Sequence, residues 1–116
     1  GNIQKMRGHS TSMVLNPFKG HSVAKRDVRN RENHETMAEF AWLDGAILFN
    51  REGIASDAGR YVQVPAGLSP KSGEGGRHLA ARAISQLSDG VAIAVSSTGS
   101  IVLYANGRER YRVRIK

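Results

Sequence analysis

The dipeptide Asn106-Gly107 is the strongest local constraint on how this sequence folds. Asn-Gly favours the positive backbone angles of a type I′ turn, which joins two antiparallel strands through two residues. The segments on either side, Ile101 to Ala105 and Arg108 to Ile115, contain mainly strand-forming and charged residues. We therefore predict a β-hairpin over these residues.

Apolar and turn-forming residues divide the rest of the chain into alternating helices and strands, so we expect an α/β domain. The break at Asn16 to Gly20 is predicted to be a turn, and the segment Ala66 to Gly76 a loop. Helices are predicted over HETMAEFAWL, with Asn33 as N-cap, and from Arg77 to about Leu87. Strands are predicted over Gly45 to Phe49, Arg60 to Val64 and Val91 to Val95. The first and the last of these strands are expected to be buried.

Composition bounds the class of protein. A chain of 116 residues is expected to form one domain, residues 1–116. It has no cysteine, hence no disulfide and no thiolate zinc site, which fits a cytoplasmic protein. No apolar run reaches membrane-spanning length, and GNIQKMRGHS is not a signal peptide, so no membrane partner is expected. The net charge of +7 favours polyanionic partners.

Much of that charge lies in the last predicted strand. Strict alternation would place Tyr111, Val113 and Ile115 on one face, and on the other face five cations: Arg108, Arg110, Arg112, Arg114 and Lys116. This basic face is either a nucleic-acid-binding surface or a sheet edge kept soluble by charge. We favour the second interpretation because no aromatic residue interleaves the arginines as a base-stacking surface requires.

The segment Gly75-Gly76-Arg77-His78 precedes the second predicted helix. Glycines allow a ligand to approach the backbone, and the first turn of a helix offers free N–H groups to an anion. With the Arg and His side chains the segment forms a possible phosphate site. It is equally well explained as a flexible loop before a helix, and local sequence does not separate the two.

Two further polar segments lie at the ends of predicted elements. Asp44 precedes a buried strand, where a carboxylate can bind a divalent metal or simply turn the backbone; taken alone, the turn is favoured. The run Ser96-Ser97-Thr98-Gly99 is either a phosphate loop or an ordinary turn. Together with Arg77 and His78, these residues favour metal-assisted chemistry on a nucleotide or phosphoester.

The order of several motifs resembles the diadenylate cyclase domain of DNA-integrity-scanning proteins and their single-domain relatives, over nearly the whole chain. The archaeal-type branch is the most similar, through NPFKG and EFAWLDGA. The motifs are Asp44-Gly45-Ala46, Ala58-Gly59-Arg60-Tyr61, Gly75-Gly76-Arg77-His78, Ser88-Asp89-Gly90 and Val95-Ser96. The resemblance implies a mixed parallel and antiparallel central sheet flanked by helices.

The resemblance also implies an activity: two ATP molecules would be joined into cyclic di-AMP with Mn²⁺ or Mg²⁺, in a face-to-face, two-fold homo-oligomer. Asp44 would bind the metal, and Arg77 and His78 would contact phosphates as catalytic residues. The implied nucleotide-binding residues are Gly45, Ala46, Gly59, Tyr61, Val62, Gly75, Gly76, Arg77, His78 and Ser96.

Three departures from the family pattern suggest a rival hypothesis about the function. Gly76 stands where relatives usually carry Thr, and Ser97 stands where they usually carry Glu. The chain also begins at Gly1, after the position where relatives have a further strand. The rival is a catalytically weakened module that binds ATP or cyclic di-AMP as a sensor.

Overall fold

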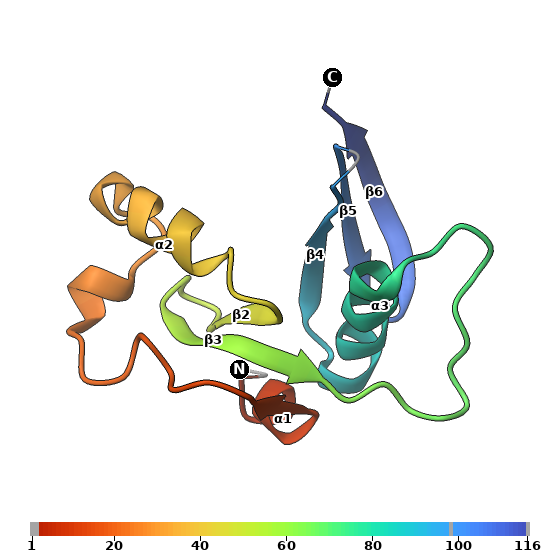
Figure 1. The fold of residues 1–116 in the computed structure, drawn as a ribbon, viewed down its shortest axis with the longest axis horizontal. Helices are drawn as coiled ribbons and strands as arrows, with labels where there is room; N and C mark the ends of the chain where they lie inside the picture. Colours follow the sequence, from red (N-terminus) through yellow and green to blue (C-terminus); the bar gives the residue numbers. More distant parts are fainter. Residues whose placement is uncertain (1–2, 98, 116) are drawn as a thin grey trace. The chain divides into compact units, whose positions relative to one another are not determined.

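The computed structural model describes residues 3–97 and 99–115. The chain forms two compact units, Gly1–Tyr61 and Val62–Lys116, and each is described by itself (Figure 1). Within the described residues no helix has the length and apolar character needed to cross a membrane.

The first unit contains two short helices, α1 (Ile3–Gly8) and α2 (His34–Phe40), and a three-stranded sheet. The strands are β1 (Ser10–Ser12), β2 (Ala46–Phe49) and β3 (Ala55–Val62), in the order β1-β3-β2. Two 3-10 turns, Val23–Arg26 and Arg31–Asn33, precede α2. β2 and β3 are antiparallel and joined by a turn in which the Asn50 side chain accepts hydrogen bonds from the N–H groups of Glu52 and Ile54.

The core of the first unit forms around Phe18, whose ring meets that of Phe40 edge-on at 5.0 Å, with Met37, Ala55 and Ala58 buried beside it. The predicted turn at residues 16–20 holds Phe18 there, because the Asn16 side chain accepts from the N–H of Phe18 and donates to the carbonyl of Ser56. Burying such a cluster is the main favourable term for a unit of this size.

The predicted start of α2 at His34, with Asn33 at the N-cap position, is confirmed. The Asn33 side chain forms no capping hydrogen bond, however, and its amide donates to the carbonyls of Ala24 and Asp27. Two other predicted boundaries in this unit were wrong. α2 ends at Phe40 rather than Leu43, since the chain tightens into i→i+3 turns before Asp44. β3 begins at Ala55 rather than Arg60 because the tight turn returns the chain directly onto β2.

The second unit consists of one helix, α3 (Gly76–Ser88), and an antiparallel sheet in the order β4-β5-β6. Its strands are β4 (Val91–Val95), β5 (Ser100–Ala105) and β6 (Arg108–Arg114). The predicted hairpin is confirmed: Asn106 and Gly107 have φ angles of 53° and 75°, as a type I′ turn requires.

α3 packs on one face of this sheet, and Figure 1 shows the helix in front of the lower part of the strands. Ala81, Ala94, Val102 and Tyr104 form the buried layer between them. The prediction that Val91–Val95 is buried on both faces was wrong: Val91, Ile93 and Val95 are 56%, 62% and 54% exposed. α3 covers only the opposite face of the sheet, where Ala94 is buried. These three residues lie on the face that α3 does not cover.

β6 contains a register shift that the sequence pattern did not predict. Leu103 pairs with Tyr111 and Tyr104 with Glu109, so Arg110 is an extra residue, as in a β-bulge. Side chains directly opposite one another share a face, so Glu109, Arg112 and Arg114 lie on the α3 side with Tyr104, Val102 and Ser100. The predicted common face of Arg108, Arg110, Arg112 and Arg114 was therefore wrong, and Lys116 lies outside the described residues.

The α/β class is confirmed at the level of helices combined with small antiparallel sheets. A single mixed central sheet is not confirmed, because the described strands form two sheets, and β2–β3, β4–β5 and β5–β6 are antiparallel pairs.

Candidate functional site

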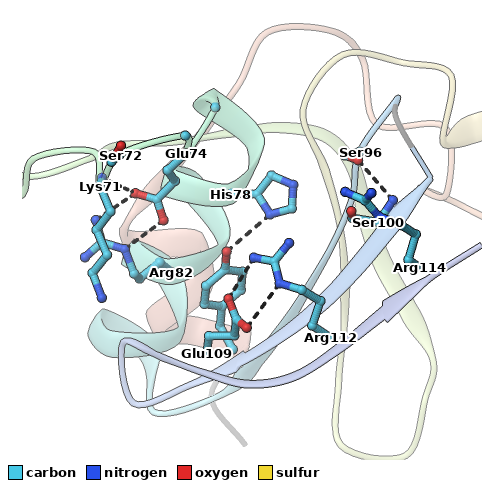
Figure 2. Close-up of a pocket in the computed structure, with 13 residues that line it drawn as sticks. Lys71, Ser72, Glu74, His78, Arg82, Ser96, Ser100, Glu109, Arg112 and Arg114 are labelled. Atoms are coloured by element: carbon cyan, nitrogen blue, oxygen red, sulfur yellow. Dashed lines mark hydrogen bonds and ion pairs between the residues drawn. The ribbon is translucent and has the colours of Figure 1, made fainter.

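The second unit has a polar pocket of about 390 Å³ between the start of α3 and the β5–β6 hairpin. Three residues selected from the sequence line it: Gly75, His78 and Ser96 (Figure 2). The other lining residues are Lys71, Ser72, Gly73, Glu74, Arg82, Ser100, Tyr104, Glu109, Arg112 and Arg114. Four of the lining side chains are Lys or Arg and two are Glu, so the pocket favours an anionic ligand.

An ion pair between Glu74 and Arg82 forms one wall of the pocket. The Arg82 guanidinium donates to both Glu74 oxygens, Nε to Oε2 at 3.0 Å and Nη2 to Oε1 at 2.9 Å. Nη2 also donates to the carbonyl of Ser69 at 2.7 Å, and the N–H of Lys71 donates to Glu74. Hydrogen bonds from Arg82 lower the pKa of Glu74, against the opposing effect of burial. The pair therefore fixes the loop that leads into Gly75 and α3.

His78 and Tyr104 lie next to each other on the floor of the pocket. The Nδ1 atom of His78 shares a hydrogen bond with the Tyr104 hydroxyl at 3.2 Å, and the two rings meet edge-on. Burial raises the pKa of Tyr104, and the charges of Glu74 and Glu109 raise it further. Tyr104 therefore keeps its proton at neutral pH and fixes the orientation of the His78 ring.

Other residues selected from the sequence, at this helix start and at the end of β3, do not line the pocket. Gly76 is exposed, and a Cβ built there would meet nothing within 4 Å. Arg77 donates from Nη1 to the carbonyl of Val95 at 3.0 Å and so ties α3 to β4. Val62 ends β3 and is half-buried.

The first unit brings a second group of selected residues together around β2 and β3. Asp44 is exposed in the bend before β2; its Oδ1 accepts from the N–H of Gly45 at 3.1 Å, and its carboxylate accepts from the Tyr61 hydroxyl. That hydrogen bond raises the pKa of Tyr61 above its usual value of 10.0. Ala46 pairs with Arg60 across the strands, beside Gly59. The arrangement holds one oriented carboxylate at the surface of this unit.

Gly45 has a structural role that predicts a large mutational effect. Its φ angle is +103°, and a Cβ would lie 2.7 Å from the carbonyl oxygen of Arg60. Because the clash is with backbone, Gly45→Ala should destabilise the first unit by about 2–4 kcal/mol, measured by urea denaturation. Gly8→Ala is the matched control, since nothing lies within 4 Å of its Cβ position. Equal stability of the two variants would contradict the assignment.

The Asp44 carboxylate is suited to bind a divalent cation whose other ligands come from water and a bound phosphate compound. The described residues include no cluster of three or more His, Asp or Glu side chains that could bind a metal by themselves. Mg²⁺ and related ions usually bind one or two carboxylates and complete their shells with water and phosphate oxygens. Asp44, exposed and with a hard oxygen donor, meets that requirement.

Comparison with known proteins gives the family context. Residues 10–109 match the nucleotide-binding family described as DisA bacterial checkpoint controller. The chain belongs to this family. It is 35% identical over 103 residues to a diadenylate cyclase of Methanocaldococcus jannaschii and 31% identical over 104 residues to one of Haloferax volcanii. Each match covers 88% of this chain but only 32% and 37% of those relatives, so the chain spans about a third of their length.

Sequence reasoning selected only three of the thirteen residues that line the polar pocket. Arg112 and Arg114 come from β6 and were assigned to a basic face, and Ser100 of β5 was not selected. The face of the two arginines depends on the bulge at Arg110, which no residue type at that position indicates. Glu74 and Arg82 were also missed, although a carboxylate and an arginine flanking a glycine loop were visible in the sequence.

Proposed function

We propose that this chain is the nucleotide-binding and catalytic part of a diadenylate cyclase, which joins two ATP molecules into cyclic di-AMP. The observation that carries the proposal is the membership of a nucleotide-binding family together with a cation-rich pocket lined by Gly75, His78 and Ser96. The names of the two archaeal relatives support the reaction type. A cytoplasmic location, where ATP is available, is part of the proposal.

In the proposed reaction the 3′-oxygen of one ATP attacks the α-phosphorus of the other. The new P–O bond replaces the bond to the bridging oxygen, pyrophosphate leaves, and the hydroxyl proton passes to solvent; the same step in the opposite direction closes the ring. Catalysis of this kind depends mainly on positioning and on stabilising phosphate charge.

The proposal assigns a role to each selected residue. His78, held by Tyr104, donates from its other ring nitrogen to a phosphate oxygen, and Gly75 lets the phosphate approach the backbone at the start of α3. Ser96 adds a hydroxyl, and Arg77 is the proposed cation at the helix start outside the pocket.

Tyr61 and Val62 are the proposed adenine contacts, with Gly45, Ala46 and Gly59 shaping the strands beside them. Asp44 would hold Mn²⁺ or Mg²⁺, which when bound would neutralise charge on the phosphates.

The proposal requires that two copies meet. If each subunit holds one ATP, the attacking 3′-oxygen and the target phosphate belong to different subunits, so the active form is a two-fold, face-to-face oligomer. Activity per subunit should therefore fall on dilution.

The test is product formation. The chain is incubated with ATP and Mn²⁺ at high protein concentration, and cyclic di-AMP and pyrophosphate are measured by mass spectrometry and a phosphate assay. Formation of both products in a 1:2 ratio supports the cyclase. ATP binding without product would instead favour the sensor module, which the replacements at Gly76 and Ser97 make the second candidate.

Gly76→Thr tests whether position 76 faces the proposed phosphate site. The structure has open space at this Cβ, so the substitution should leave the fold intact and add a hydroxyl beside the proposed phosphate site. We expect ATP affinity to rise about three- to tenfold, the value of one added hydrogen bond. Gly67→Ala, another open position, is the control, and calorimetric titration with ATP is the measurement. Unchanged affinity would show that position 76 does not face the phosphates.

A further inference from the structure

The β-bulge at Arg110 divides the arginines of β6 between two environments. Arg112 and Arg114 lie on the α3 side of the sheet and line the pocket, whereas Arg108 pairs with Ala105 and shares the other face with Tyr111. All seven residues of β6 are exposed, as at a solvated strand edge, but only Arg112 and Arg114 among its arginines line the pocket. The bulge therefore places these two arginines where they can contact a ligand bound there.

Most charges in the pocket neutralise each other in pairs. Arg82 pairs with Glu74, and Arg112 pairs with Glu109 at 2.8 Å, which lowers the pKa of Glu109. Two cations remain, Lys71 and Arg114, and within residues 3–97 and 99–115 neither side chain forms an ion pair within 4.0 Å, although the charge of Lys71 acts on Glu74 and Glu109. Figure 2 shows them at opposite ends of the pocket. The net positive charge is thus concentrated at two points rather than spread over the lining.

Arg114 lies among groups suited to an oxyanion. It is directly opposite Ser100 in the β5–β6 register, and the N–H of Ser100 donates to Oγ of Ser96 at 3.1 Å. Figure 2 shows the guanidinium next to these two serines and facing the cavity that His78 and Gly75 also line. A guanidinium binds two phosphate oxygens at once in a fixed planar geometry, which makes Arg suited to this position.

We propose that Arg114, turned into the pocket by the bulge at Arg110, is a phosphate-binding residue that holds the polyphosphate chain of the nucleotide against Ser96 and Ser100. The proposal rests on the proposed function, because it names a binding group for the same nucleotide. It assigns to β6 a part of the site that sequence patterns attributed to solubility.

The test measures binding of three probes, ATP, inorganic triphosphate and adenosine, by calorimetric titration of the full chain. Arg114→Gln should weaken ATP and triphosphate about 10- to 100-fold, the value of a charge-assisted bidentate contact, and leave adenosine unchanged. The control, Arg108→Gln, removes the same charge from the opposite face of β6 and should stay within about twofold of the wild type. Arg114→Lys, which keeps the charge but loses the planar fork, should be intermediate. Circular dichroism checks that each variant is folded.

The outcomes separate this inference from the proposed function. If ATP binds and Arg114→Gln behaves like Arg108→Gln, the inference is overturned and the cyclase proposal stands. If triphosphate binds in an Arg114-dependent way but ATP does not, the anion site is supported and the nucleotide function is overturned. If the wild type binds neither ATP nor triphosphate, both are overturned.

Discussion

Asp44→Asn is expected to lower cyclic di-AMP formation by at least about 100-fold while leaving the chain folded. The Asp44 carboxylate accepts hydrogen bonds from the N–H of Gly45 and the hydroxyl of Tyr61, and the amide oxygen of Asn can accept both. What the variant loses is a negative charge and a hard anionic oxygen, the properties that bind a divalent cation. Product is measured by mass spectrometry over a range of Mn²⁺ concentrations.

Two additional readouts show whether the loss arises at the metal. Glu52→Gln makes the same charge change in the exposed β2–β3 turn of the same unit and should keep wild-type activity. The hydrogen bond to Asp44 and the charge of Asp44 both raise the pKa of Tyr61. Asp44→Asn can keep the hydrogen bond but removes the charge, so tyrosine titration should still shift to lower pH, and that shift would show that the contact exists in solution. Undiminished turnover in Asp44→Asn would remove Asp44 as the metal ligand. Equal loss in both variants would indicate a general electrostatic effect.

The elements fixed by local chemistry were predictable from the sequence. Asn106-Gly107 fixed the hairpin because these residues tolerate positive φ, and the Ala-rich stripe after Gly76 marked α3 because small residues allow close packing on a sheet. His78 and Ser96, selected at the ends of elements, do line a common pocket. In these cases a residue type and its immediate neighbours determine the structure.

The features that failed prediction depend on contacts distant in sequence. Whether Val91, Ile93 and Val95 are buried depends on what covers the second face of the sheet, which a run of apolar residues does not specify. The face taken by Arg114 depends on one extra residue in β6, and a shift of one residue reverses every side chain beyond it. The Glu74–Arg82 pair joins a loop residue to a residue of α3 eight positions later, a spacing that helix periodicity does not predict.

That same Glu74–Arg82 pair carries the largest stability effect expected in the second unit. Its side chains are only 8% and 7% exposed, and Arg82 also holds the carbonyl of Ser69. Removing one partner of a buried pair leaves the other charge without compensation, so Arg82→Gln should destabilise the unit by about 2–4 kcal/mol at pH 7. The only Trp, Trp42, lies in the other unit, so stability is best measured by hydrogen exchange of the α3 amides. Arg31→Gln, an exposed arginine outside this unit, is the control.

A second substitution and a change of pH isolate the interaction itself. The double variant with Glu74→Gln should recover part of the loss, because neither charge is then left unpaired. The pKa of Glu74 is lowered in the folded chain, so its contribution is complete above its usual value of 4.5 and is lost as pH falls through the lower folded value. The gap between wild type and Arg82→Gln should therefore narrow in that acid range. A gap that is constant from pH 7 to below this range would mean that Arg82 acts through packing and its bond to Ser69, and that the ion pair adds nothing.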